Sequence, residues 1–229
     1  RRMKTTKAFQ LGLDQIRTMG SWMLWFVGIY AISYLSVLFI PDFFNLDWSI
    51  REIEWTFFHG MINSGKIFFL ICGLLTLWIF IKYYVSNGMT RNDYFKGTMG
   101  AVVVLSLILT VIITIFSIVE WFFFSNMSTG FMALFLKAPL ELVLYYLLGW
   151  FIGAGFYRYS FFAGLFSILL SIIVLIVHGE IWGEAGSIPW LEWLNLTTSV
   201  GGAVVISLFL IIALAAVIRH LIKDMRIKI

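Results

Sequence analysis

The sequence predicts an all-α membrane protein with six transmembrane helices. Of its 229 residues, 61% are hydrophobic and only 12% are charged, whereas soluble domains contain roughly 25% charged residues. Six almost uncharged runs approach the length of about 20 residues that a helix needs to cross a hydrocarbon core of roughly 30 Å. None of these runs alternates between polar and apolar residues, as the strands of a membrane barrel do. Helices are therefore the expected spanning elements.

The six predicted spans are separated by turn residues and charged segments. They cover residues 20–40, 67–85, 98–119, 138–157, 160–177 and 200–218. Residues 1–19 precede them, and residues 222–229 form a basic tail. The sequence thus predicts a single membrane domain over residues 20–221.

The distribution of Lys and Arg predicts that both ends of the chain are cytoplasmic, because these residues resist translocation. With the N-terminus inside, only Arg51, Lys66 and Lys137 fall on the outer side. The inner segments then contain Arg1, Arg2, Lys4, Lys7, Arg17, Lys82, Arg91, Lys96, Arg158, Arg219, Lys223, Arg226 and Lys228. Basic residues next to a membrane attract anionic lipid headgroups. The formal charge of +4 therefore predicts contact with membrane lipid rather than with nucleic acid.

Residues 1–19 have the pattern of a short amphipathic helix. Phe9, Leu13 and Ile16 recur at helical spacing, and most of the charged side chains lie elsewhere around the helix. Such a helix lies in the membrane interface. Two roles are open for it: a simple membrane anchor, or a cytoplasmic elbow that contacts a partner subunit.

A second short helix is predicted between the second and third spans. Asn87-Gly88 is a turn signal. Thr90 and Asp93 are spaced as a helix N-terminal cap, in which the hydroxyl accepts a hydrogen bond from a free backbone N–H. The segment is therefore either a capped helix that protrudes at the cytoplasmic face or an ordinary solvated loop.

One carboxylate, that of Glu141, enters a predicted span, and Lys137 precedes it by one helical turn. A pair at this spacing near the outer surface contributes little to stability. Charge inside a membrane is also often functional, which makes a transport role the alternative. On the same span, Gly149 and Gly153 form a small face against which another helix can pack.

The sequence contains no recognisable catalytic or metal site, so we expect a non-catalytic chain without a cofactor. Residues 60–67 have the glycine and lysine spacing of a phosphate-binding P-loop, but Ile67 stands where Ser or Thr should bind Mg²⁺, and no strand precedes the segment. The three histidines are isolated in sequence, and Cys72 is the sole cysteine. No cluster of metal ligands is therefore predicted.

Together these features resemble the permease subunit of a type-2 ABC exporter. The stretches NGMTRNDYFKG (87–97) and LGWFIGAGFYR (148–158) are similar to small permeases of Gram-positive bacteria, including exporters of phenol-soluble modulins and other peptides. The resemblance implies a multi-pass protein of the bacterial plasma membrane, paired with a second, identical or related permease. A separate cytoplasmic ABC ATPase would hold ATP and Mg²⁺.

The resemblance also assigns residues to the contact with the ATPase. The coupling helix would comprise Thr90, Arg91, Asn92, Asp93, Tyr94 and Phe95, with the two aromatic residues as apolar anchors and Arg91 and Asp93 setting the orientation. The elbow would touch the same partner through Phe9, Leu13, Ile16 and Arg17. The expected cargo is an amphipathic peptide or a lipid-like or drug-like molecule leaving the cell. A membrane sensor or immunity protein without transport, and an intramembrane enzyme, are the alternatives.

Overall fold

A computed structural model describes the backbone of residues 7–44, 57–124, 131–159, 161–183 and 199–223, and side chains within most of these ranges. These residues are helical apart from short turns and contain no strand. The elements are α1 (Lys7–Phe44), α2 (Phe57–Leu75), the π-helix η2 (Thr76–Phe80), α3 (Ile81–Ser86), α4 (Arg91–Phe124), α5 (Phe131–Arg158), α6 (Phe161–Ile181) and α7 (Val200–Lys223).

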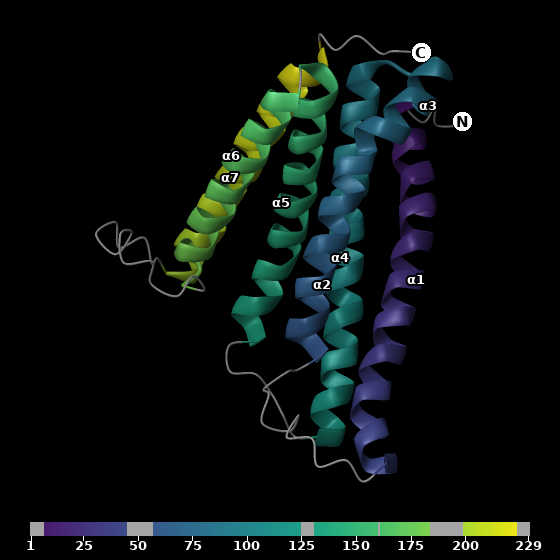
Figure 1. The fold of residues 1–229 in the computed structure, drawn as a ribbon, viewed down its shortest axis with the longest axis vertical. Helices are drawn as coiled ribbons and strands as arrows, with labels where there is room; N and C mark the ends of the chain where they lie inside the picture. The colour runs from purple at the N-terminus through teal and green to yellow at the C-terminus, as the bar shows by residue number, and fades with distance from the viewer. Residues whose placement is uncertain (1–6, 45–56, 125–130, 160, 184–198, 224–229) are drawn as a thin grey trace, which may run out of the picture.

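Within the described part of the chain, six helical segments are long and apolar enough to cross a membrane, as expected of a multi-pass membrane protein. They form an elongated bundle in which successive segments run up and down (Figure 1). We call the end at which α1 begins and α7 ends the terminal end; the turn between α3 and α4 also lies there. The opposite end is called the far end.

The helices are longer than the predicted spans because they continue through charged residues. The second span begins at Phe57, ten residues before the predicted start at Ile67, and therefore includes Lys66. The third runs from Arg91 to Phe124 as one helix. The expected separate coupling helix is thus the first turns of a spanning helix. The predicted spans were too short because a charged residue interrupts an apolar run in the sequence, whereas the hydrogen bonding of the helix continues through it.

The N-terminal segment is likewise continuous with the first span, since α1 runs from Lys7 to Phe44 without interruption. It packs against α4 where two glycines meet: a Cβ on Gly12 would lie 3.1 Å from the carbonyl oxygen of Gly97. Leu11 and Met19 are buried on this side. A distinct elbow helix is therefore not present among the described residues.

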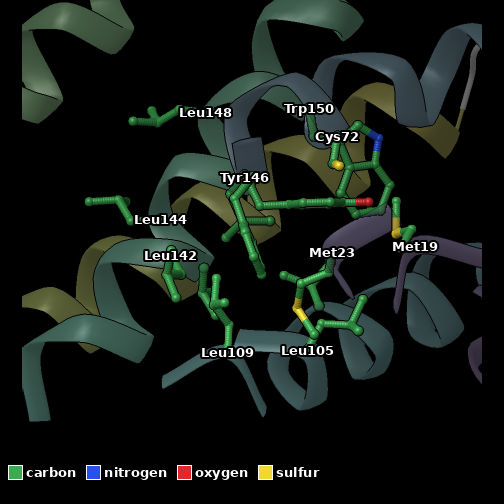
Figure 2. Close-up of a cluster of buried hydrophobic side chains, with 14 of the residues drawn as sticks. Met19, Met23, Cys72, Leu105, Leu109, Leu142, Leu144, Tyr146, Leu148 and Trp150 are labelled. Atoms are coloured by element: carbon green, nitrogen blue, oxygen red, sulfur yellow. The ribbon is translucent and has the colours of Figure 1, made fainter. Parts of the chain in front are cut away.

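Helix α5 occupies the middle of the bundle and packs against α2, α4, α6 and α7. Leu142, Tyr146 and Trp150 are fully buried on one side, where side chains from α1, α2 and α4 gather around them (Figure 2). Leu144 and Leu148 point away from this group and are also buried. Burial on both sides makes α5 the core of the bundle.

Glycines allow α2 and α5 to approach until their backbones touch. A Cβ on Gly149 would lie 2.0 Å from the carbonyl oxygen of Leu70, and one on Gly73 would lie 2.0 Å from that of Tyr146. Gly153 lies on the same side of α5, and a Cβ on it would lie 3.1 Å from the Leu74 carbonyl oxygen. No other residue type fits at the first two positions without moving a helix. The small face of α5 is thus directed at α2.

The π-helix η2 gives α2 and α5 a polar link inside the core. In this turn the backbone N–H of Ile81 donates to the Thr76 carbonyl oxygen, five residues back. The same oxygen accepts a hydrogen bond of 2.7 Å from the hydroxyl of Tyr94. The Thr76 hydroxyl lies 2.5 Å from that of Tyr146. Three helices are therefore joined at one buried threonine.

Candidate functional site

The segment between α3 and α4, at the terminal end, contains the predicted turn and the predicted N-terminal cap. Gly88 has a φ of 78°, and the N–H groups of Gly88 and Met89 donate to the carbonyls of Val85 and Tyr84, which is the Schellman arrangement that ends a helix. Thr90 then caps α4. Its hydroxyl accepts from the Asp93 N–H at 3.1 Å and donates to the Asp93 carboxylate at 2.7 Å.

The residues expected to form a coupling helix differ sharply in exposure. Thr90 and Asn92 are exposed, while Arg91, Asp93 and Phe95 are partly covered. Tyr94 is fully buried, with its ring at 6.1 Å from that of Trp150. In this conformation Tyr94 is therefore not an accessible anchor for a partner. Sequence spacing predicted the cap correctly but did not reveal which side of α4 faces the bundle.

Two arginines cap the end of α7. Arg91 of α4 donates to the carbonyl oxygen of Lys223 at 2.6 Å, and Arg158 at the end of α5 donates to that of Leu221 at 2.7 Å. The last carbonyls of a helix lack partners within the helix, and the end carries partial negative charge, so guanidinium groups stabilise it. A side chain at the start of α4 is thus tied to the end of the last span.

Charged residues also gather in the interior, toward the far end, around Glu141. Lys66 Nζ lies 2.9 Å from Glu141 Oε2, and Lys137 Nζ lies 3.6 Å from Oε1. His178 Nδ1 lies 4.0 Å from Oε1. Three residues from α2, α5 and α6 therefore converge on the carboxylate of Glu141. We call Lys66, Lys137, Glu141 and His178 the charge cluster.

Polar contacts continue from the charge cluster to α7. His178 Nε2 lies 3.1 Å from the hydroxyl oxygen of Ser207, and Trp182 Nε1 donates to the same oxygen at 3.1 Å. The Lys137 ammonium lies 5.3 Å from the centre of the Trp182 ring, within the range of a cation–π interaction. A path of polar contacts thus connects four spanning helices.

The charge cluster is much more buried than the sequence suggested. The side chains of Lys137 and Glu141 are each 5% exposed, and that of Lys66 is 12% exposed. The predicted pair between Lys137 and Glu141 is present, but it is not at an exposed surface. Lys66, expected outside, lies nine residues after Phe57, about 14 Å along α2. Burial of this kind makes the pairing energetically important.

A small cavity of about 20 Å³ lies between α2 and α5 beside the charge cluster. Two of its lining residues, His59 and Asn63, are exposed, and Lys137 and Glu141 are buried. Among the residues that the structure describes, the cavity is lined by Phe58, His59, Ile62, Asn63, Lys66, Lys137, Ala138 and Glu141. Such a volume holds a water molecule or an ion of similar size.

A second carboxylate, that of Glu120 on α4, lies at the beginning of α2. Its Oε1 accepts a hydrogen bond of 2.5 Å from the hydroxyl of Tyr34 on α1. Its Oε2 lies 3.0 Å from the backbone nitrogen of Phe57, which donates to it. The first N–H groups of a helix have no partner within the helix and favour negative charge. Glu120 therefore caps α2 from another helix and connects three helices.

The residues expected to form an elbow contact lie along the first turns of α1. Phe9 and Leu13 are 55% and 43% exposed, Arg17 is exposed, and Ile16 is partly covered. Phe9 and Leu13 are therefore outside the face that packs on α4.

Among the residues that the structure describes, no three His, Cys, Asp or Glu side chains are grouped closely enough to hold a metal ion.

Comparison with known proteins returned no match: no family model, no curated protein and no solved structure resembles the chain closely enough to be recognised.

Sequence reasoning missed Lys66, His178 and Ser207 as members of one polar group. The signal for Lys66 was present, because residues 55–65 before it contain no charge and extend the helix upstream. His178 and Ser207 had no such signal, since 29 residues separate them. Only the packing of α6 and α7 against α5 brings them to Glu141.

Proposed function

We propose that the chain is the membrane subunit of an ATP-driven ABC exporter, with the terminal end in the cytoplasm. Basic residues at this end include Lys82, Arg91, Lys96 and Arg158, and their number supports a cytoplasmic orientation. Energy would come from a separate ATPase, which holds ATP and Mg²⁺, and a second permease would complete the transport path in the bacterial plasma membrane. The cargo would be an amphipathic peptide or a lipid-like molecule.

The observation that supports this proposal best is the connection between α4 and α7 at the terminal end. The exposed side chains of Thr90 and Asn92 offer a surface to a partner, and Arg91 between them donates to the Lys223 carbonyl oxygen. Arg219 also donates to the Asn92 side-chain oxygen at 3.5 Å. A force applied to this surface would therefore move the ends of two spanning helices together.

The contact with the ATPase is assigned to Thr90, Arg91 and Asn92 rather than to the ring of Tyr94. An exposed residue at the start of a helix is reached without unfolding, whereas Tyr94 holds the Thr76 carbonyl. The helix begins at a fixed position because Thr90 and Asp93 cap it reciprocally. A well-defined helix start suits a docking surface that must transmit movement.

The proposal is tested by purifying the full-length chain from its own membranes and analysing ATPase subunits that co-purify. The partner is identified by a P-loop sequence and by Mg²⁺-dependent ATP hydrolysis. We expect Asn92→Trp to lose this partner while the thermal stability of the chain is unchanged, because the side chain is exposed.

Tyr83→Trp is the matched control, because Tyr83 is also exposed near this end but lies outside the proposed surface. It should keep the partner and its ATP hydrolysis. The proposal is wrong if no ATPase with a P-loop accompanies the wild-type chain. It is wrong in its choice of surface if Asn92→Trp retains both binding and stimulated hydrolysis.

A further inference from the structure

The π-helix η2 interrupts the α-helical hydrogen bonding of the second span. The backbone N–H of Ile81 donates to the Thr76 carbonyl oxygen, five residues back, and α-helical bonding resumes in α3. A π turn therefore contains one residue more than an α turn. Single π turns are rare, and helices bend at such places. The second span thus has one position at which its two parts can meet at different angles.

The protein interior restrains η2 on one side. Thr76 and Leu77 are fully buried, whereas the side chains of Trp78 and Ile79 are 51% and 50% exposed. In a membrane these two side chains face fluid lipid rather than packed protein. A change of angle at η2 therefore moves its outer side without breaking the contacts of a packed core.

Beyond η2, the short helix α3 is held by few contacts. Of its six residues, Ile81 and Tyr84 are buried, while Lys82, Tyr83 and Ser86 are exposed. The Tyr84 hydroxyl donates to the Asp14 carboxylate of α1 at 2.7 Å. Segments with few buried side chains change conformation at low cost in free energy. Helix α3 is thus the part of the second span that moves with the least loss of packing.

A side chain of α4 holds the π turn. The Thr76 carbonyl oxygen accepts from the Ile81 N–H and, at 2.7 Å, from the Tyr94 hydroxyl. A carbonyl oxygen has two lone pairs and accommodates both donors. Tyr94 is fully buried and lies in the first turn of α4, so the position of its hydroxyl follows the start of α4.

We propose that η2 is a hinge of the second span and that the Tyr94 hydroxyl holds it at one angle through the Thr76 carbonyl. When this hydrogen bond breaks, α3 changes its angle to α2. Helix α2 keeps its place, because its backbone touches that of α5 at Gly73. The hinge is a property of the chain alone and does not depend on the proposed transport function.

The test measures the distance between two spin labels by pulsed electron paramagnetic resonance on the full-length chain in lipid nanodiscs. Ile67→Cys and Tyr83→Cys place the labels at exposed positions on either side of η2, and Cys72 is buried and gives a low background. Tyr83 follows Ile67 by 16 positions, or about 24 Å along a helix. We expect the distance distribution to become about twofold wider when Tyr94→Phe is added.

Val103→Cys and Val119→Cys are the matched label positions on α4. They are also exposed and 16 positions apart, but an uninterrupted α-helix joins them. Their distribution should be narrow with and without Tyr94→Phe. Tyr34→Phe is the control for the loss of a tyrosine hydroxyl, because this hydroxyl donates to Glu120. It should leave the distribution across η2 unchanged.

Deletion of Ile79 is the second test. It removes the extra residue of η2, so the turn becomes α-helical while α2 and α3 keep their sides toward the bundle. We expect the deletion to restore the narrow distribution between positions 67 and 83 in the Tyr94→Phe background.

Equal distributions across η2 with and without Tyr94→Phe would overturn the proposal, because Tyr94 would then hold no hinge. A wide distribution that persists after deletion of Ile79 would also overturn it, since the bend would then lie elsewhere in the second span. Tyr94→Phe keeps the buried ring, so the first comparison decides the matter even if the deletion variant does not fold.

Discussion

Lys66 Nζ lies 2.9 Å from Glu141 Oε2, so an ion pair joins α2 to α5 in the interior of the far end. Removing one member of a buried pair leaves the other charge without compensation and costs about 3 kcal/mol or more. We therefore expect Glu141→Gln to lower the free energy of unfolding by about 3 kcal/mol, measured by denaturant titration in mixed micelles. In the Glu141→Gln variant, Lys66→Met should lower the free energy of unfolding much less than it does in the wild-type chain, because the two residues are coupled. Additive losses would contradict the pairing.

Gly149 should not tolerate even one additional carbon atom. A Cβ there would lie 2.0 Å from the Leu70 carbonyl oxygen, so Gly149→Ala must separate α2 from α5. We expect a loss of about 3 kcal/mol, as in overpacked cores, together with a lower melting temperature.

Gly100→Ala is the matched control within α4. Nothing lies within 4 Å of a Cβ at Gly100, and alanine favours a helix over glycine by about 1 kcal/mol. This variant should equal or exceed the wild type in stability. A change of stability in the same direction for both alanine variants would contradict the prediction that α2 and α5 lie too close at Gly149 to admit a Cβ.

Glu120 is expected to stabilise the far end by capping α2. Glu120→Gln keeps the shape of the side chain but removes the charge that accepts from the Phe57 N–H and the Tyr34 hydroxyl. Hydrogen bonds to charged groups contribute about 2 kcal/mol, and we expect a loss of this size. Tyr34→Phe should cost less, and the double variant should cost less than the sum. Thermal unfolding of the four proteins measures this coupling.

Tyr94 is expected to act within the chain rather than on its surface. Tyr94→Phe removes the hydroxyl that donates to the Thr76 carbonyl at 2.7 Å, which should cost about 1 kcal/mol of stability. The exposed Tyr83→Phe should cost nothing measurable. Unchanged stability in Tyr94→Phe would show that the contact with the π-helix contributes nothing.

The two ends of the bundle should be accessible from opposite sides of the membrane. Cys72 is buried, so the wild-type chain gives a low background with a membrane-impermeant thiol reagent. Asn87→Cys in the turn before α4 at the terminal end and Ser199→Cys directly before α7 at the far end place thiols at exposed positions. In intact cells we expect labelling of Ser199→Cys alone, and of both variants after the cells are opened. Labelling of both in intact cells would contradict the orientation.

The six spanning helices could be predicted from the sequence, because the length and hydropathy of a run are local properties. The turn at Asn87-Gly88 and the cap at Thr90 were also predictable, since each depends on residues within five positions of one another. Helix ends were less predictable. Lys66 appeared to end a span, yet its charge is accommodated by Glu141, which is 75 positions away in the sequence and therefore outside any local pattern.

The charge cluster was determined only by tertiary packing. The sequence by itself established an apolar chain, the helical spacing of Lys137 and Glu141, and the small face that includes Gly149. Which side of each helix faces the interior depends on how the helices pack, and hydropathy says little about this when nearly every position is apolar. Packing against α5 buried Lys66 and His178 beside Glu141 and placed Tyr94 in the core. Burial then made those contacts energetically important, because charges interact more strongly in a protein interior than in water.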